Sequence, residues 1–409
     1  MLSFRNENPV FPGATLMSAT ATASAVSFVP FHRAMLGEDE IKAVTEVLES
    51  GWLTTGPRVK QFESAFASAV TAENAIAVSS CSAALHLALA AIDLKMDDEV
   101  ILPTMTFAST GEVVLYFGAK PVLIDCAPNS FHMDPKLIER QITPRTRAII
   151  PVHYSGYAAD MDSILHLARR HNLKVIEDAA HAFPSSYKCA PVGTLGDITC
   201  FSFYATKTLT TGEGGMITTQ DRSLAERMRI LSLHGISRDA WKRYTAEGTW
   251  QYDIQDLGFK YNLTDLQAAI GLVQLEKSER MRQLRAALAE RYTGELGSFE
   301  GFSIPKIPSH VEHAWHLYVI HVDNRVLSIG RDQVIQELKQ RGIGTSVHFI
   351  PLHLHSLYQQ RLGYREGMFP VAEEHFAGAI SLPLFPGMNE TEQSRVLQAL
   401  QDIARQHRR

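Results

Sequence analysis

From Phe28 onward, short apolar runs alternate with stretches whose apolar residues recur at helical spacing. Within Glu38–Ser50 these residues are Ile41, Val44, Val47 and Leu48, and Gly51 follows where a helix would end. The predicted strands are Ala75–Val78, Glu99–Leu102, Pro121–Ile124, Ala148–Val152, Lys174–Ile176 and Thr199–Phe203, and predicted helices between them include Ala83–Ile92 and Met161–His171. This alternation predicts an α/β fold with a large, mostly parallel sheet and helices on both of its faces.

After Thr219 the pattern changes to longer helices and then to a second, smaller α+β unit. Leu263–Leu275 and Glu276–Gly294 form one extended helical region. The smaller unit is predicted to contain strands Leu317–Val322 and Thr345–His348 and helices Arg331–Arg341 and Glu390–Arg405. We therefore predict a disordered extension over residues 1–27, a large domain over 28–275 and a small C-terminal domain over 276–409.

The composition narrows the functional classes. The 409 residues are 45% hydrophobic and 20% charged, and the net charge is −5, which argues against a general nucleic-acid binder or membrane-surface binder. Four widely separated cysteines without a C-x-x-C pair indicate neither a disulfide framework nor a zinc site, and they favour a reducing, cytoplasmic setting. No apolar run approaches the roughly 18 residues of a spanning helix, so membrane insertion is not expected.

Polar residues follow several predicted strands, at the edge where open parallel sheets bind ligands. They are the turn Ser79–Ser82, the segment Thr104–Ser109, Glu177 and Asp178 with His181, and Ser202 with Lys207. The turn leads into a helix and is either a phosphate-binding site or an ordinary serine cap, and the turn alone favours the cap. No G-x-G-x-x-G or P-loop motif occurs, which disfavours nicotinamide enzymes and P-loop NTPases.

Three other features have two readings each. Lys207 precedes a Gly- and Thr-rich loop and is either a Schiff-base lysine or a surface lysine. At least one carboxylate of Glu177 and Asp178 should face the site, although a helix cap is an equal alternative. Phe107 could stack on an aromatic cofactor or belong to the core. The C-terminal histidines lack H-E-x-x-H spacing, so no metal is predicted.

Taken together, several segments resemble the pyridoxal-phosphate-dependent sugar aminotransferases of the DegT/DnrJ/EryC1/StrS type, in the right order from about Phe28 to about Ala404. The segments are Ser50–Pro57, Ala77–His86, Pro103–Phe107, Thr143–His153, Val175–His181, Phe201–Gly215, Tyr261–Ala269, His313–Leu317 and Ser381–Pro386. The resemblance implies a fold-type I transferase. One departure is the pair Cys81 and Ser82, where the family usually has Gly-Thr or Ala-Thr; the hydroxyl is kept.

The resemblance also implies roles for individual residues. Lys207 would hold pyridoxal 5′-phosphate as a Schiff base and then transfer protons, and Asp178 would pair with the ring nitrogen. Phosphate contacts would come from Cys81, Ser82, Ser202 and, for the neighbouring subunit, Asn262. Phe107 would stack on the ring and His181 would flank it, while Thr55 and His348 would line the sugar side.

The implied reaction moves an amino group from L-glutamate, which leaves as 2-oxoglutarate, to a keto group of a nucleotide-linked sugar. The wording of Ser50–Pro57 and Phe259–Asp265 is most similar to the branch that aminates UDP-4-keto sugars in the aminoarabinose pathway of lipid A. The amino sugar would serve the modification of cell-surface polysaccharide, lipopolysaccharide or lipid A. The resemblance also implies a homodimer with active sites at the subunit interface.

Two alternatives remain within the same fold. A cofactor-dependent keto-sugar dehydratase would carry histidine in place of Lys207. A non-catalytic regulatory relative would be expected to lose Lys207 or Asp178, and both residues are present.

Overall fold

The computed structural model describes residues 28–236 and 251–409, so the predicted extension over 1–27 lies outside the described residues. The helices are α1 (Glu38–Ser50), α2 (Pro57–Ala69), α3 (Cys81–Ala91), α4 (Ala108–Leu115), α5 (Pro135–Ile138), α6 (Met161–His171), α7 (Arg222–Leu231), α8 (Asp265–Leu296), α9 (Arg331–Gln340), α10 (Ser356–Leu362), α11 (Pro370–Gly378) and α12 (Glu390–Gln406). The strands are β1 (Asn74–Val78), β2 (Glu99–Pro103), β3 (Lys120–Ile124), β4 (Thr146–Ile149), β5 (Lys174–Asp178), β6 (Ser186–Tyr187), β7 (Ala190–Pro191), β8 (Ile198–Ser202), β9 (Gly215–Thr219), β10 (Phe302–Ser303), β11 (Val311–Glu312), β12 (Tyr318–Val322) and β13 (Ala379–Leu382). Short 3₁₀ helices cover Glu139–Gln141, Tyr154–Gly156 and Leu352–Leu354.

The large sheet has seven strands in the order β1-β9-β8-β5-β4-β2-β3. Strands β2, β3, β4, β5 and β8 pair in parallel, whereas β9 runs antiparallel to both β1 and β8. The prediction of a mostly parallel sheet is confirmed. Because the parallel strands share one direction, the segments that follow β2, β5 and β8 emerge at one edge of the sheet.

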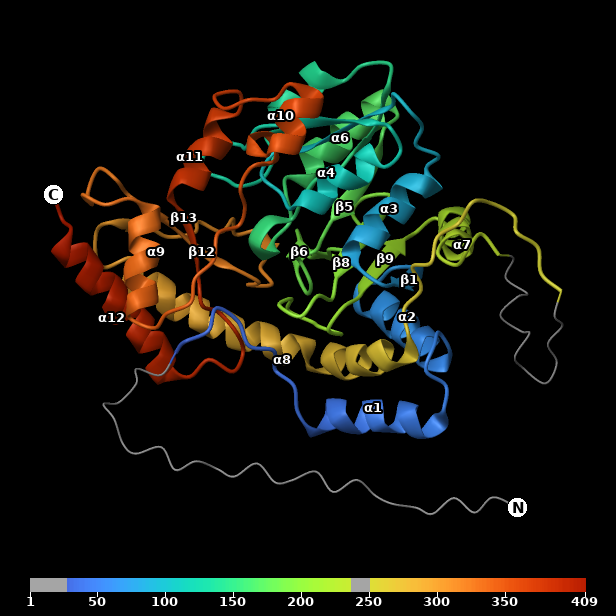
Figure 1. Ribbon diagram of the computed structural model, residues 1–409, viewed down its shortest axis with the longest axis horizontal. Coiled ribbons are helices and arrows are strands. Elements are labelled where there is room, and N and C mark those ends of the chain that lie inside the picture. Colours follow the sequence, from blue (N-terminus) through green and yellow to red (C-terminus); the bar gives the residue numbers. More distant parts are fainter. Residues whose placement is uncertain (1–27, 237–250) are drawn as a thin grey trace, which may run out of the picture.

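Helices cover both faces of this sheet, as predicted (Figure 1). The core on one face joins side chains of α3, α4 and α7 to the strands. The core on the other face joins α2, α6 and the beginning of α8. Strand residues such as Ile101 and Ile176 are almost completely buried, as expected for strands covered on both sides.

The C-terminal unit has its own core around a three-stranded sheet in the order β10-β12-β13. Val29, from the segment before α1, belongs to this core, and α8 runs without interruption through the predicted domain boundary at residue 275. The domain division therefore stays a prediction. The predicted strand Thr345–His348 is wrong: only Ser346 forms an isolated bridge, with Ser381, because β13 is the strand that pairs with β12.

Helix α1 forms over the predicted residues, but its apolar side chains are not all buried. Val47 is buried together with Glu40, whereas Ile41 and Leu48 are 68% and 55% exposed. The Glu40 carboxylate accepts hydrogen bonds from Gln274 (2.8 Å) and Lys277 (3.0 Å) of α8. Polar contacts of Glu40 therefore help to attach α1 to α8, and Figure 1 shows α1 along the outer side of α8.

Helix α2 was not predicted, because its N-terminal cap comes from far along the chain. Gly56, at the cap position, has no side chain to bond the first turn. The buried carboxylate of Asp265 accepts instead from the backbone N–H groups of Gly56 (2.8 Å), Arg58 (3.1 Å) and Val59 (3.0 Å). The first residue of α8 thus joins the two helices. No helix within the described ranges is long and apolar enough to cross a bilayer.

We expect Asp265→Ala to lower the free energy of unfolding by about 3 kcal/mol, because three N–H groups at a buried helix end lose a charged acceptor. The matched control is Asp39→Ala. Asp39 forms one exposed ion pair with Lys277 at 2.9 Å, so its loss should change stability by less than about 0.5 kcal/mol. Urea unfolding measures both, and equal effects of the two substitutions would contradict the capping role.

Candidate active site

The predicted acid and lysine lie together at the carboxyl edge of the large sheet. Asp178 ends β5 and is buried; its Oδ2 accepts from the Thr110 hydroxyl at 2.7 Å and its Oδ1 from the Ala180 N–H at 3.1 Å. Lys207 lies in the loop after β8, and its N–H donates to Tyr204 O at 2.9 Å. The two side chains interact electrostatically, so the sheet brings together an acid and an amine that are 29 positions apart.

Burial changes the protonation of both groups. It lowers the pKa of Lys207 to about 8, although Cys81 and Asp178 act in the opposite direction. Burial raises the pKa of Asp178, against the hydrogen bonds from Thr110 and Ala180 and the charge of Lys207. A lysine of this kind carries a substantial neutral fraction near neutral pH, which a nucleophilic amine requires.

Glu177 faces away from this pair. Its carboxylate accepts from Gly196 N–H and Thr199 Oγ1, both at 2.7 Å, and lies 2.6 Å from His153 Nε2. Glu177 and His153 are completely buried. The Nδ1 atom of His153 accepts from Ala159 N–H at 3.2 Å, which leaves Nε2 as the donor to Glu177. Of the two candidate carboxylates, Asp178 is therefore the one in the site.

The turn between β1 and α3 presents unpaired N–H groups. Ser80 caps the helix by accepting from Ala83 N–H at 3.0 Å, which confirms the cap interpretation for that residue. The N–H groups of Cys81 and Ser82 have no acceptor within the described residues, and the Ser82 side chain is exposed. The turn packs against β9, since a Cβ on Gly215 would lie 2.6 Å from the Ser80 carbonyl carbon. This helix end can bind an anion.

The Cys81 thiol does not take part in that anion site. Its Sγ lies 3.6 Å from the Cys200 carbonyl oxygen, and burial raises its pKa well above the usual range. Only the backbone of Cys81 is therefore available to a ligand. Ser202, at the end of β8, accepts from Tyr204 N–H at 3.3 Å and is partly exposed.

Aromatic side chains surround the acid–amine pair. Phe107 is 58% exposed at the beginning of α4, and its ring lies 5.7 Å from that of Phe349. His181 is buried, accepts from Ser155 N–H at 3.2 Å through Nδ1, and lies 4.4 Å from the ring of His316. Burial and the charge of Lys207 hold the pKa of His181 well below its usual range. Its proton is therefore on Nε2.

The two predicted sugar-side residues lie in different places. His348 stacks on Phe31 at 5.6 Å, bonds Ser381 Oγ through Nδ1 at 2.8 Å, and has its pKa lowered to about 4 by burial and Lys207. Thr55 instead contacts Asn262, whose Nδ2 donates to Thr55 Oγ1 at 2.7 Å. Asn262 forms a bridge with Val78, so this pair lies beside the turn after β1.

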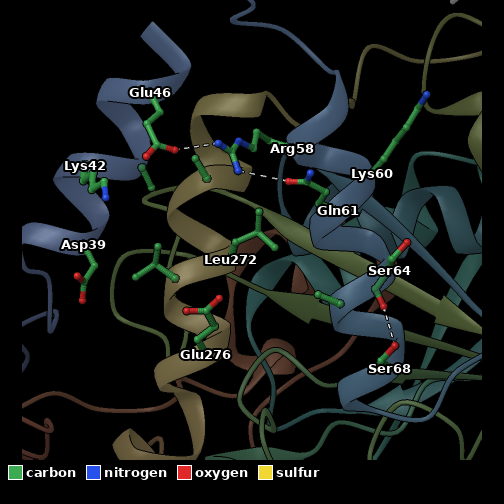
Figure 2. Close-up of a pocket in the computed structure, with 14 residues that line it drawn as sticks. Asp39, Lys42, Glu46, Arg58, Lys60, Gln61, Ser64, Ser68, Leu272 and Glu276 are labelled. Carbon is green, nitrogen blue, oxygen red and sulfur yellow. Dashed lines mark hydrogen bonds and ion pairs between the residues drawn. The ribbon is translucent and has the colours of Figure 1, made fainter. Parts of the chain in front are cut away.

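A surface cavity of about 1020 Å³ between α1, α2 and α8 contains none of the predicted site residues (Figure 2). Arg58 in this cavity donates to Glu46 at 2.9 Å and to Gln61 at 3.4 Å. Charges of both signs line it, and its carboxylates are not buried as Asp178 is. This cavity and the pair of reactive side chains, Asp178 and Lys207, therefore lie in different parts of the molecule.

Sequence reasoning missed several residues that contact the site. Thr110, Ser155 and the peptide N–H of Ala180 hold Asp178 and His181, and no periodicity marks them. His32 also lies close to Lys207, and Arg285 lies close to His32 and His316, as the electrostatic interactions among these groups show. In the sequence, the only signal for these residues is that they lie near segments that resemble the aminotransferase family.

The family model described as the DegT/DnrJ/EryC1/StrS aminotransferase family matches residues 34–401. The chain belongs to this family. It is therefore a transaminase, and pyridoxal 5′-phosphate is its cofactor. Within the described residues, no group of three or more His, Cys, Asp and Glu side chains could hold a metal ion.

Relatives of this aminotransferase cover nearly its whole length. The spore coat polysaccharide biosynthesis protein SpsC of Bacillus subtilis is 47% identical, over 92% of this chain and 97% of the relative. The putative sugar aminotransferase Spr1654 of Streptococcus pneumoniae, in its PLP form, has a TM-score of 0.86 and 32% identity, over 93% and 99% of the two chains. Helicobacter pylori PseC, an aminotransferase involved in the biosynthesis of pseudoaminic acid, has a TM-score of 0.86 and 27% identity, over 93% and 100%. These relatives confirm the fold class and the sugar aminotransferase family, and they give no support to the aminoarabinose branch.

The residues at the sheet edge fit this cofactor. A carboxylate (Asp178) suits a cationic ring nitrogen, free N–H groups at Cys81 and Ser82 suit a phosphate, and the amine of Lys207 suits an aldehyde. The exposed ring of Phe107 and the buried ring of His181 supply aromatic surfaces near the same pair.

We expect the apo-aminotransferase to take up pyridoxal 5′-phosphate through Lys207 at a rate that rises with pH, with a midpoint near 8. Only the neutral amine reacts, and burial lowers the pKa of Lys207 from 10.5 to about 8. Stopped-flow absorbance measures the rate. Asp178→Asn should move the midpoint to lower pH, because Asp178 raises the pKa of Lys207. A wild-type midpoint above pH 10 would refute a buried reactive lysine.

Proposed function

We propose that this aminotransferase moves the amino group of L-glutamate to a keto group of a nucleotide-linked sugar, with UDP-4-keto sugars as the first class to test. The observation that carries the proposal is the combination at the sheet edge: a buried Asp178, a lysine of lowered pKa at Lys207, and a free helix end at Cys81 and Ser82. The names of the relatives SpsC and PseC support a role in making surface polysaccharide or its sugar precursors. Lipopolysaccharide or lipid A modification remains the narrower form of this proposal.

Each residue has a role in the mechanism. Pyridoxal 5′-phosphate, when bound, supplies a ring that stabilises negative charge on the substrate carbon. Asp178, hydrogen-bonded by Thr110 and Ala180, would present a carboxylate to the ring nitrogen and keep it protonated. Lys207 would hold the cofactor, and its Nζ, whose neutral form is accessible near pH 8, would accept and return the proton of the substrate carbon.

The remaining contacts orient the reactants. The hydroxyl groups of Ser82 and Ser202 and the N–H of Cys81 would donate hydrogen bonds to the phosphate. Phe107 covers one face of the ring and His181 flanks it through its protonated Nε2. His348 would line the side where the sugar enters. Asn262 would bind the phosphate held by the other subunit, and Thr55, which is hydrogen-bonded to Asn262, would line the sugar side of that subunit's site.

The dehydratase and the regulatory relative are weaker alternatives. The dehydratase would be expected to carry histidine in place of Lys207, and the regulatory relative to lack Lys207 or Asp178. This chain has both residues, and their side chains interact. The cytoplasmic setting of the proposal rests on four cysteines that are all free.

A homodimer is part of the proposal, and exposed apolar side chains near the site support it. Leu53 is 46% exposed and Trp52 is 37% exposed in the segment before α2, and Phe107, Tyr204 and Ile350 are also exposed around the sheet edge. Such a concentration is typical of a surface that a partner covers. No nucleic-acid partner is proposed, in keeping with the net charge of −5.

The first test is the visible absorption spectrum of the cofactor-loaded protein before and after addition of L-glutamate. We expect a yellow band that bleaches, and its return when a nucleotide-linked keto sugar is added. Lys207→Ala should lower turnover at least about a thousandfold, because the group that carries the proton is lost. The melting profile should not change, because the substitution removes no contact of the hydrophobic core. Wild-type turnover in this variant would refute the assignment, and a band that L-glutamate leaves unchanged would refute the donor.

The second test concerns the dimer. We expect Leu53→Asp to sediment as a monomer or to weaken association at least about tenfold, because a charge is buried without a partner. Met96→Asp is the matched control, since Met96 is 73% exposed before β2, at the opposite edge of the sheet. A dimer that both substitutions leave intact would place the interface elsewhere.

A further inference from the structure

Around Arg285, three buried nitrogen atoms have no hydrogen-bond partner among the described residues: His32 Nε2, Arg285 Nε and His316 Nδ1. They come from three separate segments, namely the chain before α1, the middle of α8, and the loop before β12. Buried polar atoms are nearly always paired in folded proteins, with protein groups, water or a ligand. Three orphans in one neighbourhood therefore indicate a bound group that completes the site.

Arg285 gives this neighbourhood its charge. The residue is 1% exposed, and its guanidinium donates to the carbonyl oxygens of Trp315 (3.1 Å) and Leu384 (2.8 Å). These two bonds fix its orientation, yet no carboxylate of the described residues pairs with it. Burial lowers the pKa of Arg285 to about 10, so it remains a cation at neutral pH. A buried cation without a counter-ion favours binding of an anion.

The two histidines connect this cation to the reaction centre. The ring of His316 lies 4.4 Å from that of His181 and interacts electrostatically with both Lys207 and Arg285. His32 interacts with the same two residues and lies against the Ala205 backbone, two positions before Lys207. His32 and His316 therefore lie beside Lys207, and Arg285 adjoins His316 because it donates to the carbonyl of the preceding residue, Trp315, at 3.1 Å.

We propose that Arg285 and His316, with His32 beside them, form the carboxylate-binding subsite for the amino donor. The inference rests on the proposed function, because it assumes an amino-acid donor at Lys207. One guanidinium with an imidazole N–H matches the two oxygens and single charge of a carboxylate. The cofactor phosphate is not the occupant, since the free N–H groups of Cys81 and Ser82, in the turn after β1, provide for it.

The experiment uses the cofactor-loaded full chain with Arg285→Lys, His316→Gln and the control Arg291→Lys. Arg291 lies on the same helix, but its guanidinium bonds Ser394 Oγ at 2.7 Å on the far side of the C-terminal unit. Two readouts are measured: the L-glutamate concentration that half-bleaches the cofactor band, and the rise in melting temperature caused by glutarate, a dicarboxylate that cannot react. The affinity for pyridoxal 5′-phosphate is measured alongside.

We expect Arg285→Lys to raise the half-bleaching concentration at least about tenfold and to abolish most of the glutarate-induced stabilisation. His316→Gln should raise it several-fold, and it carries the test if Arg285→Lys does not fold. The affinity for the cofactor should change less than about twofold, and Arg291→Lys should behave as wild type. Repeating the titration with L-alanine assigns the carboxylate: an equal loss means the α-carboxylate, and a loss for L-glutamate alone means the side-chain carboxylate.

The proposal is overturned if glutarate stabilises Arg285→Lys and His316→Gln as much as wild type, because water alone then satisfies the orphan atoms. It is also overturned if donor and cofactor affinities fall in equal proportion, which indicates a purely structural arginine. A wild-type protein whose band does not respond to L-glutamate refutes the proposed donor instead. The glutarate comparison still decides the subsite in that case.

Discussion

The buried carboxylate of Asp178 opposite Lys207 is the constraint on which the site depends. A carboxylate placed in the interior is unfavourable unless it receives hydrogen bonds and faces a cation. Thr110 and the Ala180 N–H supply the hydrogen bonds, and Lys207 supplies the cation. Because these groups follow different strands, the parallel sheet must be in register before the acid and the amine can meet.

The segment Tyr154–Gly156 transmits this arrangement to the C-terminal unit. The Tyr154 hydroxyl donates to the His348 carbonyl, and the Ser155 N–H donates to His181. Leu317 and Ala314 donate to the carbonyls of Ser155 and Gly156. Gly156 has φ +129°, and a Cβ there would lie 2.9 Å from the His313 ring, so only glycine permits this approach. Residues from both units therefore share one site.

The surroundings of Lys207 are unusual in their charge. Several histidines close to it have pKa values far below the usual range, because burial and the neighbouring lysine and arginine both disfavour a second cation. The histidines thus remain neutral hydrogen-bonding groups at physiological pH. Among the described side chains around these histidines, Arg285 is the one that stays a cation throughout the physiological pH range. An anionic group of the substrate would therefore bind beside it.

The sequence by itself determined the α/β class, the parallel strands and the family, because apolar periodicity and local motifs are properties of short segments. It also indicated Lys207 and Asp178, each next to a strand end. Position after the strand did not distinguish Glu177 from Asp178, and only the family resemblance chose Asp178. The tertiary structure gives the physical reason, since His153, Gly196 and Thr199 from other segments bind the Glu177 carboxylate. The tertiary structure likewise decided that Asp265 caps α2, that Thr345–His348 does not form a strand, and that Arg285 is buried. Each of these features arises from contacts between residues far apart in the chain, which no local pattern records.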